Sequence, residues 1–177
     1  MKILKFFLFA MAIVSFSACS SDDDSNDDQG PVEIVLNNDN LVGTYEIIYY
    51  AGSGQTSVTA TGGVTVVTET DVYSGDVFTN AMLTFNTDGT YAFSGSYVET
   101  YTVTVTGQAP ETQQGVVNLD ETGTFGFNNA NRTITLNGEL YNVTFFNETN
   151  LNMTNSYEET FQGITETDSF EFRLEKQ

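Results

Sequence analysis

The sequence contains no histidine, no tryptophan and a single cysteine, Cys19, among its 177 residues. It therefore cannot build a Ser-His or Cys-His catalytic pair, an internal disulfide, or a zinc site made of histidine and cysteine ligands. Carboxylate, tyrosine and lysine chemistry remains open to an enzyme, but no two carboxylates are marked as a glycosidase-type pair. We therefore expect a protein without enzymatic activity, catalytic residues or cofactors.

Basic residues are scarce as well, because five Lys and Arg stand against 24 Asp and Glu, for a formal net charge of −19. A field of this sign repels nucleic acid and anionic headgroups, and it favours cations or neutral ligands. Nucleic acid is therefore excluded as a partner, and no motif identifies a protein partner. The acidic residues near expected turns lack the spacing of an EF-hand loop, so no metal site is predicted.

The one cysteine follows a short apolar segment. Lys2 and Lys5 precede an apolar stretch at 6–14, the pattern of a secretory signal peptide that is too short to cross a bilayer as a mature helix. Ser17, Ala18 and Cys19 resemble the lipobox of bacterial lipoproteins, with Phe16 where leucine is usual. The resemblance implies cleavage after residue 18 and attachment of acyl chains, such as palmitate, that anchor Cys19 in a membrane. The alternative is an ordinary signal peptide with an incidental cysteine.

Residues 19–40 are predicted to form a disordered acidic tether, because they hold too few apolar side chains to pack. The Ser-Asp-Asp-Asp stretch after Cys19 resembles the export signal that sends lipoproteins of Bacteroidota to the outer face of the outer membrane, whereas a solvated spacer is the alternative. We expect anchoring at the outer membrane, on the cell surface or facing the periplasm. The apolar island at 32–36 either docks as an edge strand or belongs to the tether.

Removal of residues 1–18 leaves 177 − 18 = 159 residues, which suits one domain, with a formal charge of 3 − 24 = −21. The domain is expected at 41–177, where Thr, Val, Phe and Tyr are frequent and Gly and Asn punctuate the chain. Nine strands are predicted, at 42–50, 57–68, 81–85, 90–105, 116–127, 132–136, 139–146, 151–157 and 165–175, with longer loops at 51–56, 69–80 and 106–115.

Alternation along 90–105 predicts either one long strand bent at Gly95 or a break near Glu99. Turn signals such as Asn137-Gly138 join neighbouring strands by short connections, which makes an antiparallel meander. The fold class is therefore all-β, and an up-and-down β-barrel of about eight to nine strands removes the exposed edges.

Two motifs resemble a known family. Leu41-Val42-Gly43-Thr44-Tyr45 is similar to the Gly-x-Trp opening of lipocalins, and residues 83–91 (LTFNTDGTY) resemble a hairpin of lipocalin-like domains in Bacteroidota lipoproteins. Over 41–177 this resemblance implies a lipocalin-like barrel that binds a small apolar ligand. In lipocalins the tryptophan closes one barrel end beneath an arginine of the last strand. The resemblance implies the same roles for Tyr45 and Arg173 through a cation–π contact.

Aromatic and apolar positions of the alternating strands are expected to line the barrel interior: Tyr91, Phe93, Tyr97, Phe125, Phe127, Tyr141, Val143 and Phe145. An eight-stranded interior either packs shut or holds one small ligand, so the same side chains also suit a plain core. Arg173 lies on the face opposite Phe172 and Leu174, so no clamp for a carboxylate is predicted. A neutral or weakly polar ligand, oriented by tyrosine hydroxyls and threonines, is favoured. The alternative is a structural or interaction module with a filled core that contacts a protein or glycan through its loops.

Overall fold

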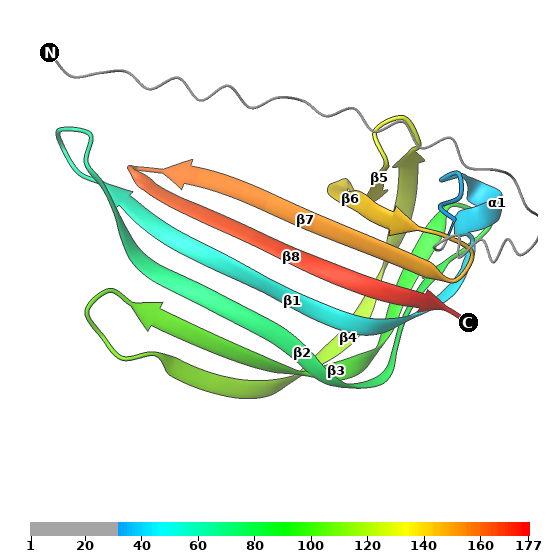
Figure 1. Cartoon of the computed structure of the whole chain (residues 1–177), viewed down its shortest axis with the longest axis horizontal. Coiled ribbons are helices and arrows are strands. Elements are labelled where there is room, and N and C mark those ends of the chain that lie inside the picture. The colour runs from blue at the N-terminus through cyan, green and yellow to red at the C-terminus, as the bar shows by residue number, and fades with distance from the viewer. Residues whose placement is uncertain (1–31) are drawn as a thin grey trace, which may run out of the picture. The chain divides into compact units, whose positions relative to one another are not determined.

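A computed structural model describes residues 32–177. The expected signal peptide, Cys19 and the larger part of the acidic tether lie outside these residues. The described part is all-β, as predicted: eight antiparallel strands follow one another in chain order in one closed sheet, in which the first strand pairs with the last (Figure 1). The elements are α1 (Asn38–Leu41), β1 (Gly43–Thr59), β2 (Thr65–Phe85), β3 (Thr90–Val105), β4 (Glu111–Asn128), β5 (Thr133–Leu136), β6 (Glu139–Phe146), β7 (Asn150–Phe161) and β8 (Ile164–Lys176).

The first hairpin differs from the prediction. The expected strand at 57–68 is wrong, because the chain turns inside it, where the N–H of Ala60 donates to the carbonyl of Val64. The predicted loops at 51–56 and 69–80 are strand, within β1 and β2. Bulges in β2 and positive φ angles of 48° at Val77 and Asn80 break its alternation, so its pattern could not be recognised as one strand.

The strand β3 is continuous from Thr90 to Val105, so the alternative of a bend at Gly95 is correct. Gly95 has a φ of 93°, and a Cβ atom there would overlap the carbonyl of Asn80 on the neighbouring strand. Only glycine therefore suits this position, where β3 bends against the irregular middle of β2.

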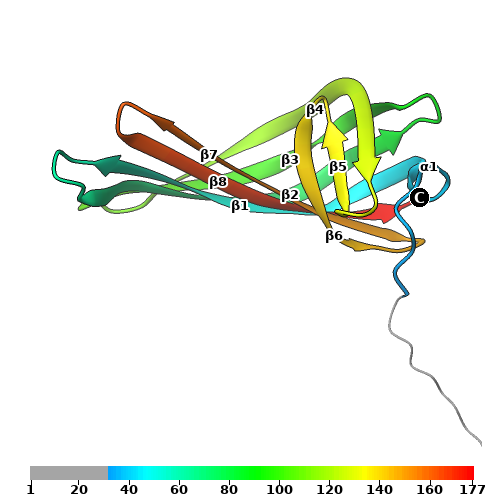
Figure 2. The same cartoon turned by 90° about the horizontal axis from the view of Figure 1, so that it is seen from above.

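The closed sheet has two halves of different character. β5 pairs with β4 only over residues 125–128, and β6 pairs with β7 only over residues 151–154. These short strands complete the ring around the core, and we call this part the closed half. The longer strands continue beyond them as a single layer (Figures 1 and 2), which we call the open half: residues 50–75, 97–121 and 155–172.

The hydrophobic core fills the closed half. Its largest fully buried side chains are Tyr45, Tyr91, Phe85, Phe146, Leu41, Ile47, Leu83, Ile134, Leu151, Met153 and Leu174. Burial of these side chains supplies the main stabilisation of a sheet whose open half is one layer thick.

The segment before β1 belongs to the packed domain. The side chain of Leu36 is only 3% exposed, and the N–H of Ile34 donates to the carbonyl of Phe146. The N–H of Leu36 donates to Asn129 Oδ1 at 3.1 Å, and the hydroxyl of Tyr45 donates to the carbonyl of Leu41 at 2.9 Å. The predicted tether is therefore too long, because the apolar island at 32–36 docks on the core. It does so without forming a strand.

Candidate binding site

The residues predicted to line the interior lie in different surroundings. Tyr91 and Tyr141 are buried in the core, and Phe93 and Phe125 pack partly buried against it. Tyr97 is buried where the two halves meet, whereas Phe127 is 39% exposed. The structure therefore does not gather these residues around one site.

Phe145 does not take the core position that alternation gave it. A bulge between Val143 and Phe145 shifts the pairing of β6 with β7 by one residue. After Tyr141 and Val143, the next buried residue of this strand is consequently Phe146, which is only 1% exposed. A one-residue insertion reverses the face of every later side chain, and nothing in the local composition announces it.

The expected contact between Tyr45 and Arg173 is wrong in its partners. The guanidinium of Arg173 lies 4.4 Å from the centroid of the Tyr49 ring and bonds to Glu171, whereas the ammonium of Lys176 lies 5.4 Å from the Tyr45 ring. Tyr45 pairs directly with Lys176 across β1 and β8, and Arg173 pairs with Tyr49. Lys176 thus occupies the position over Tyr45 that the prediction gave to Arg173.

An aromatic cluster that the sequence did not predict lies at the point where the sheet opens. The ring of Tyr50 stacks on Phe172 with centroids 4.8 Å apart, and it lies 5.3 Å from Tyr97 and 5.5 Å from Tyr73. We call Tyr50, Tyr73, Tyr97, Phe170 and Phe172 the aromatic layer. Its rings come from β1, β2, β3 and β8, and it covers the core at the boundary with the open half.

Tyr73 crosses from one strand to another over a glycine. Gly52 of β1 pairs with Tyr73 on one side and with Phe170 on the other, and a Cβ atom on Gly52 would overlap the Tyr73 ring. The absent side chain lets the Tyr73 hydroxyl reach across β1 and donate to Asp168 Oδ1 of β8 at 2.6 Å. This bridge ties three strands together and forms the floor of the open half.

Beyond the aromatic layer, carboxylates and tyrosines share the same face of the sheet. They surround a hollow of about 140 Å³ lined by Gly54, Gln55, Thr56, Asp71, Tyr73, Tyr101, Tyr157, Glu166, Thr167 and Asp168. We call it the inner hollow, because the register places Gly54, Asp71 and Asp168 on the face that carries Tyr73 and Gly52. Asp71 Oδ1 is buried and has no hydrogen-bond partner among residues 32–177.

The phenols of the site stay protonated at neutral pH. Burial, followed by the charge of Glu99, raises the pKa of Tyr50 to about 12, and burial with the Asp71 carboxylate raises the pKa of Tyr101 to about 12. Burial, and then the hydrogen bond to Asp168, raises the pKa of Tyr73 as well. These hydroxyls therefore donate hydrogen bonds and do not act as bases.

No basic side chain of residues 32–177 faces the inner hollow. The three Lys and Arg of this part are engaged elsewhere: Arg132 pairs with Glu33 at 2.6 Å, Arg173 pairs with Glu171 at 2.7 Å, and Lys176 donates to the carbonyl of Asn40 at 2.8 Å. All charged side chains that line the inner hollow are therefore acidic, and tyrosine rings lie beside them.

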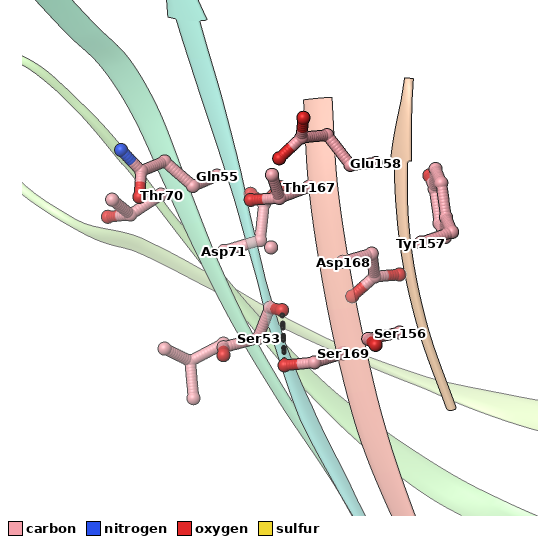
Figure 3. A pocket seen from close by; sticks show the side chains of 12 residues that line it. Ser53, Gln55, Thr70, Asp71, Ser156, Tyr157, Glu158, Thr167, Asp168 and Ser169 are labelled. Carbon is pink, nitrogen blue, oxygen red and sulfur yellow. Dashed lines mark hydrogen bonds between the residues drawn. The ribbon is translucent and has the colours of Figure 1, made fainter. Parts of the chain in front are cut away.

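A second, wider hollow of about 620 Å³ lies over the same strands. Serine, threonine and acidic side chains of β1, β2, β7 and β8 line it, and the hydroxyl of Ser169 donates to the carbonyl of Ser53 at 3.5 Å (Figure 3). Ser53, Thr70 and Ser169, which do not line the inner hollow, alternate with Gly54, Asp71 and Asp168 and so point to the opposite face. It lacks the aromatic layer, so we take the inner hollow as the candidate site.

The sequence analysis missed Tyr50, Tyr73 and Asp168. Tyr50 was obscured because an extra residue in β1, between Ile47 and Tyr49, shifts its pairing with β8. A usable signal was present in Gly52-Ser53-Gly54, because alternate glycines inside a strand indicate that another group approaches the backbone closely.

Comparisons of the chain with protein-family models, with curated proteins and with solved structures find no match. Within residues 32–177, no helix is long and apolar enough to span a bilayer. The same residues contain no group of three or more Asp, Glu, His or Cys side chains arranged to hold a metal ion.

Proposed function

We propose that this chain is a non-enzymatic binding protein, anchored to the outer membrane through lipid on Cys19, with a lipocalin-like barrel that takes a small ligand at its open end. The ligand lies against the aromatic layer and extends into the inner hollow. The observation that carries the proposal is the bridge from Tyr73 to Asp168 over Gly52, which builds an aromatic and acidic floor at the mouth of a filled core.

The chemistry of the floor selects the ligand. Carboxylates accept hydrogen bonds, aromatic faces attract cations and apolar surfaces, and no Lys or Arg of the described residues is available for an anion. The ligand is therefore neutral or positively charged and carries hydroxyl or ammonium donors. A fatty-acid carboxylate does not fit, because the acidic groups of the hollow repel it.

The filled core of the closed half favours a ligand site outside the barrel interior. Tyr45, Phe85 and Phe146 are fully buried there, among leucine and isoleucine side chains that fill the space between the strands. These side chains leave the ligand no room among them, so it contacts only the aromatic layer that covers the core.

Calorimetric titration tests the proposal with three probes: spermidine for an amine, methyl β-glucoside for a neutral polyol and laurate for an anion. We expect spermidine or the glucoside to bind and laurate not to bind. Gly52→Ala displaces Tyr73 and should weaken that binding about tenfold or more. The loss of one or two hydrogen bonds to the ligand is worth this factor. Gly115→Ala is the control, because Gly115 also lies inside a strand, does not line the inner hollow, and would have no atom within 4 Å of an added Cβ.

Tight binding of laurate, binding of none of the three probes, or equal affinities of the two glycine variants would each contradict the proposed site. Fractionation of Cys19→Ala tests the anchor separately, since this variant should be soluble or unprocessed rather than held in the membrane.

A further inference from the structure

The strand β4 has a long free edge in the open half. From Glu111 to Thr124 it pairs with β3, but β5 reaches only residues 125–128 on its other side. No other strand of residues 32–177 pairs with the first part of β4 on that side.

The hydrogen bonds at the end of β4 show which backbone groups are free. The N–H of Phe125 donates to Gly89 on the β3 side, whereas the carbonyls of Thr122 and Thr124 accept from Asn137 on the β5 side. Because successive residues of a strand point their backbone groups to opposite sides, even-numbered residues direct their N–H and C=O groups away from β3. At the free edge these are Thr112, Gln114, Val116, Asn118 and Asp120.

Most of the usual protection against pairing is missing at this edge. Natural edge strands are shielded by charged side chains, above all lysine, or by proline, bulges or short length. From residue 111 to 120 the only charged side chains of β4 are Glu111 and Asp120, at the two ends. β4 contains no Lys or Pro, and its pairing with β3 has no register shift. Val116, in the middle of the edge, is 67% exposed. The edge is therefore long, free of bulges and apolar at its centre, which suits the addition of another strand.

We propose that the edge of β4 from Glu111 to Asp120 binds an extended, basic segment of a partner polypeptide as an added strand. The occupant is a polypeptide because only a peptide backbone offers alternating donors and acceptors that match those of β4. It is basic because Glu111 and Asp120 lie on the edge itself, Glu121 follows on the same strand, and none of the three described Lys and Arg lies in residues 97–121. A second copy and the aspartate-rich residues 20–31 of this chain carry the same sign of charge as the edge, so both are disfavoured.

The test uses the full chain and a fluorescent ten-residue peptide of alternating lysine and valine, blocked at both ends. We expect one-to-one binding that weakens as salt is added. The same peptide with every amide nitrogen methylated keeps its charges but loses its backbone donors, and it should bind at least about tenfold more weakly. Val116→Pro removes the central N–H and should weaken binding of the unmodified peptide by a similar factor.

Val116→Thr is the matched control, because it keeps the N–H and the β-branched shape, and it should bind as the parent does. Absence of binding would overturn the proposal. Equal affinity for the methylated peptide would overturn it too, because electrostatic attraction alone would then explain the binding. Dimerisation that Val116→Pro abolishes would identify a second copy as the occupant and overturn it as well. Peptide binding that appears only after residues 20–31 are deleted would identify this segment of the chain as the occupant and would also overturn the proposal. If Val116→Pro does not fold, the affinities of the unmodified and the methylated peptide for the parent chain still test the proposal.

The outcomes are distinguishable from those for the inner hollow. Gly52→Ala should leave peptide binding at the β4 edge unchanged, and Val116→Pro should leave binding of spermidine or the glucoside unchanged.

Discussion

Gly95 shows how one residue governs the geometry of two strands. It combines a φ of 93° with a position where a Cβ atom would overlap the carbonyl of Asn80. Gly95→Ala should lower the free energy of unfolding by at least about 2 kcal/mol, because the left-handed backbone and the overlap both oppose the methyl group. Urea unfolding followed by circular dichroism measures this change.

Gly115→Ala provides the control for that measurement. Gly115 also lies inside a strand, but its φ is not in the left-handed region and no atom would lie within 4 Å of an added Cβ. Alanine should therefore be neutral or stabilising by up to about 1 kcal/mol. Equal losses in the two variants would show that β3 does not depend on a glycine at its bend.

The segment at 32–41 packs on the core, whereas the sequence analysis places residues up to 40 in the tether. Its apolar side chains cover the end of the core, and Leu36 is almost completely buried. Leu36→Ala should cost about 2 to 3 kcal/mol of unfolding free energy, because the removed methyl groups leave a cavity between the segment and the sheet. Thermal and urea unfolding both measure this loss.

Val35→Ala is the matched control, because Val35 is the preceding residue and is 57% exposed. This variant should change stability by no more than about 0.5 kcal/mol. If Leu36→Ala behaved in the same way, the segment would belong to the tether after all.

Tyrosine ionisation sets the alkaline limit of the whole molecule. Burial is the largest cause of a raised pKa at seven tyrosines, whose ordinary value is 10.0: Tyr45, Tyr50, Tyr73, Tyr91, Tyr97, Tyr101 and Tyr141. The folded protein holds these protons more tightly than the unfolded chain does. Their contribution to stability is therefore complete below pH 10 and is lost as the pH rises above that value.

We accordingly expect cooperative unfolding above pH 10, with tyrosinate absorbance and loss of the sheet signal in circular dichroism rising together. A stepwise rise of tyrosinate absorbance near pH 10 with the sheet signal intact would show that these phenols are not held in a packed environment.

Local physics made part of this structure predictable from the sequence. Alternating side chains identify strands because one face of each strand must be buried, and Asn137-Gly138 predicts a tight turn because both residues tolerate positive φ. The all-β class, the antiparallel order and the bend at Gly95 followed from such signals. The net charge also predicts cations or neutral ligands over anions, and this stays a prediction.

Tertiary structure decided the rest. One-residue bulges in β1 and β6 reversed the phase of the alternation, so the inward positions of Tyr50 and Phe146 could not be read from composition. The aromatic layer gathers residues that are far apart in the chain, and its bridge from Tyr73 to Asp168 exists only because Gly52 lies between them in space. Half of the sheet is open because β5 and β6 are shorter than the strands beside them. Each of these depends on the register between strands, which long-range packing selects and local sequence does not encode.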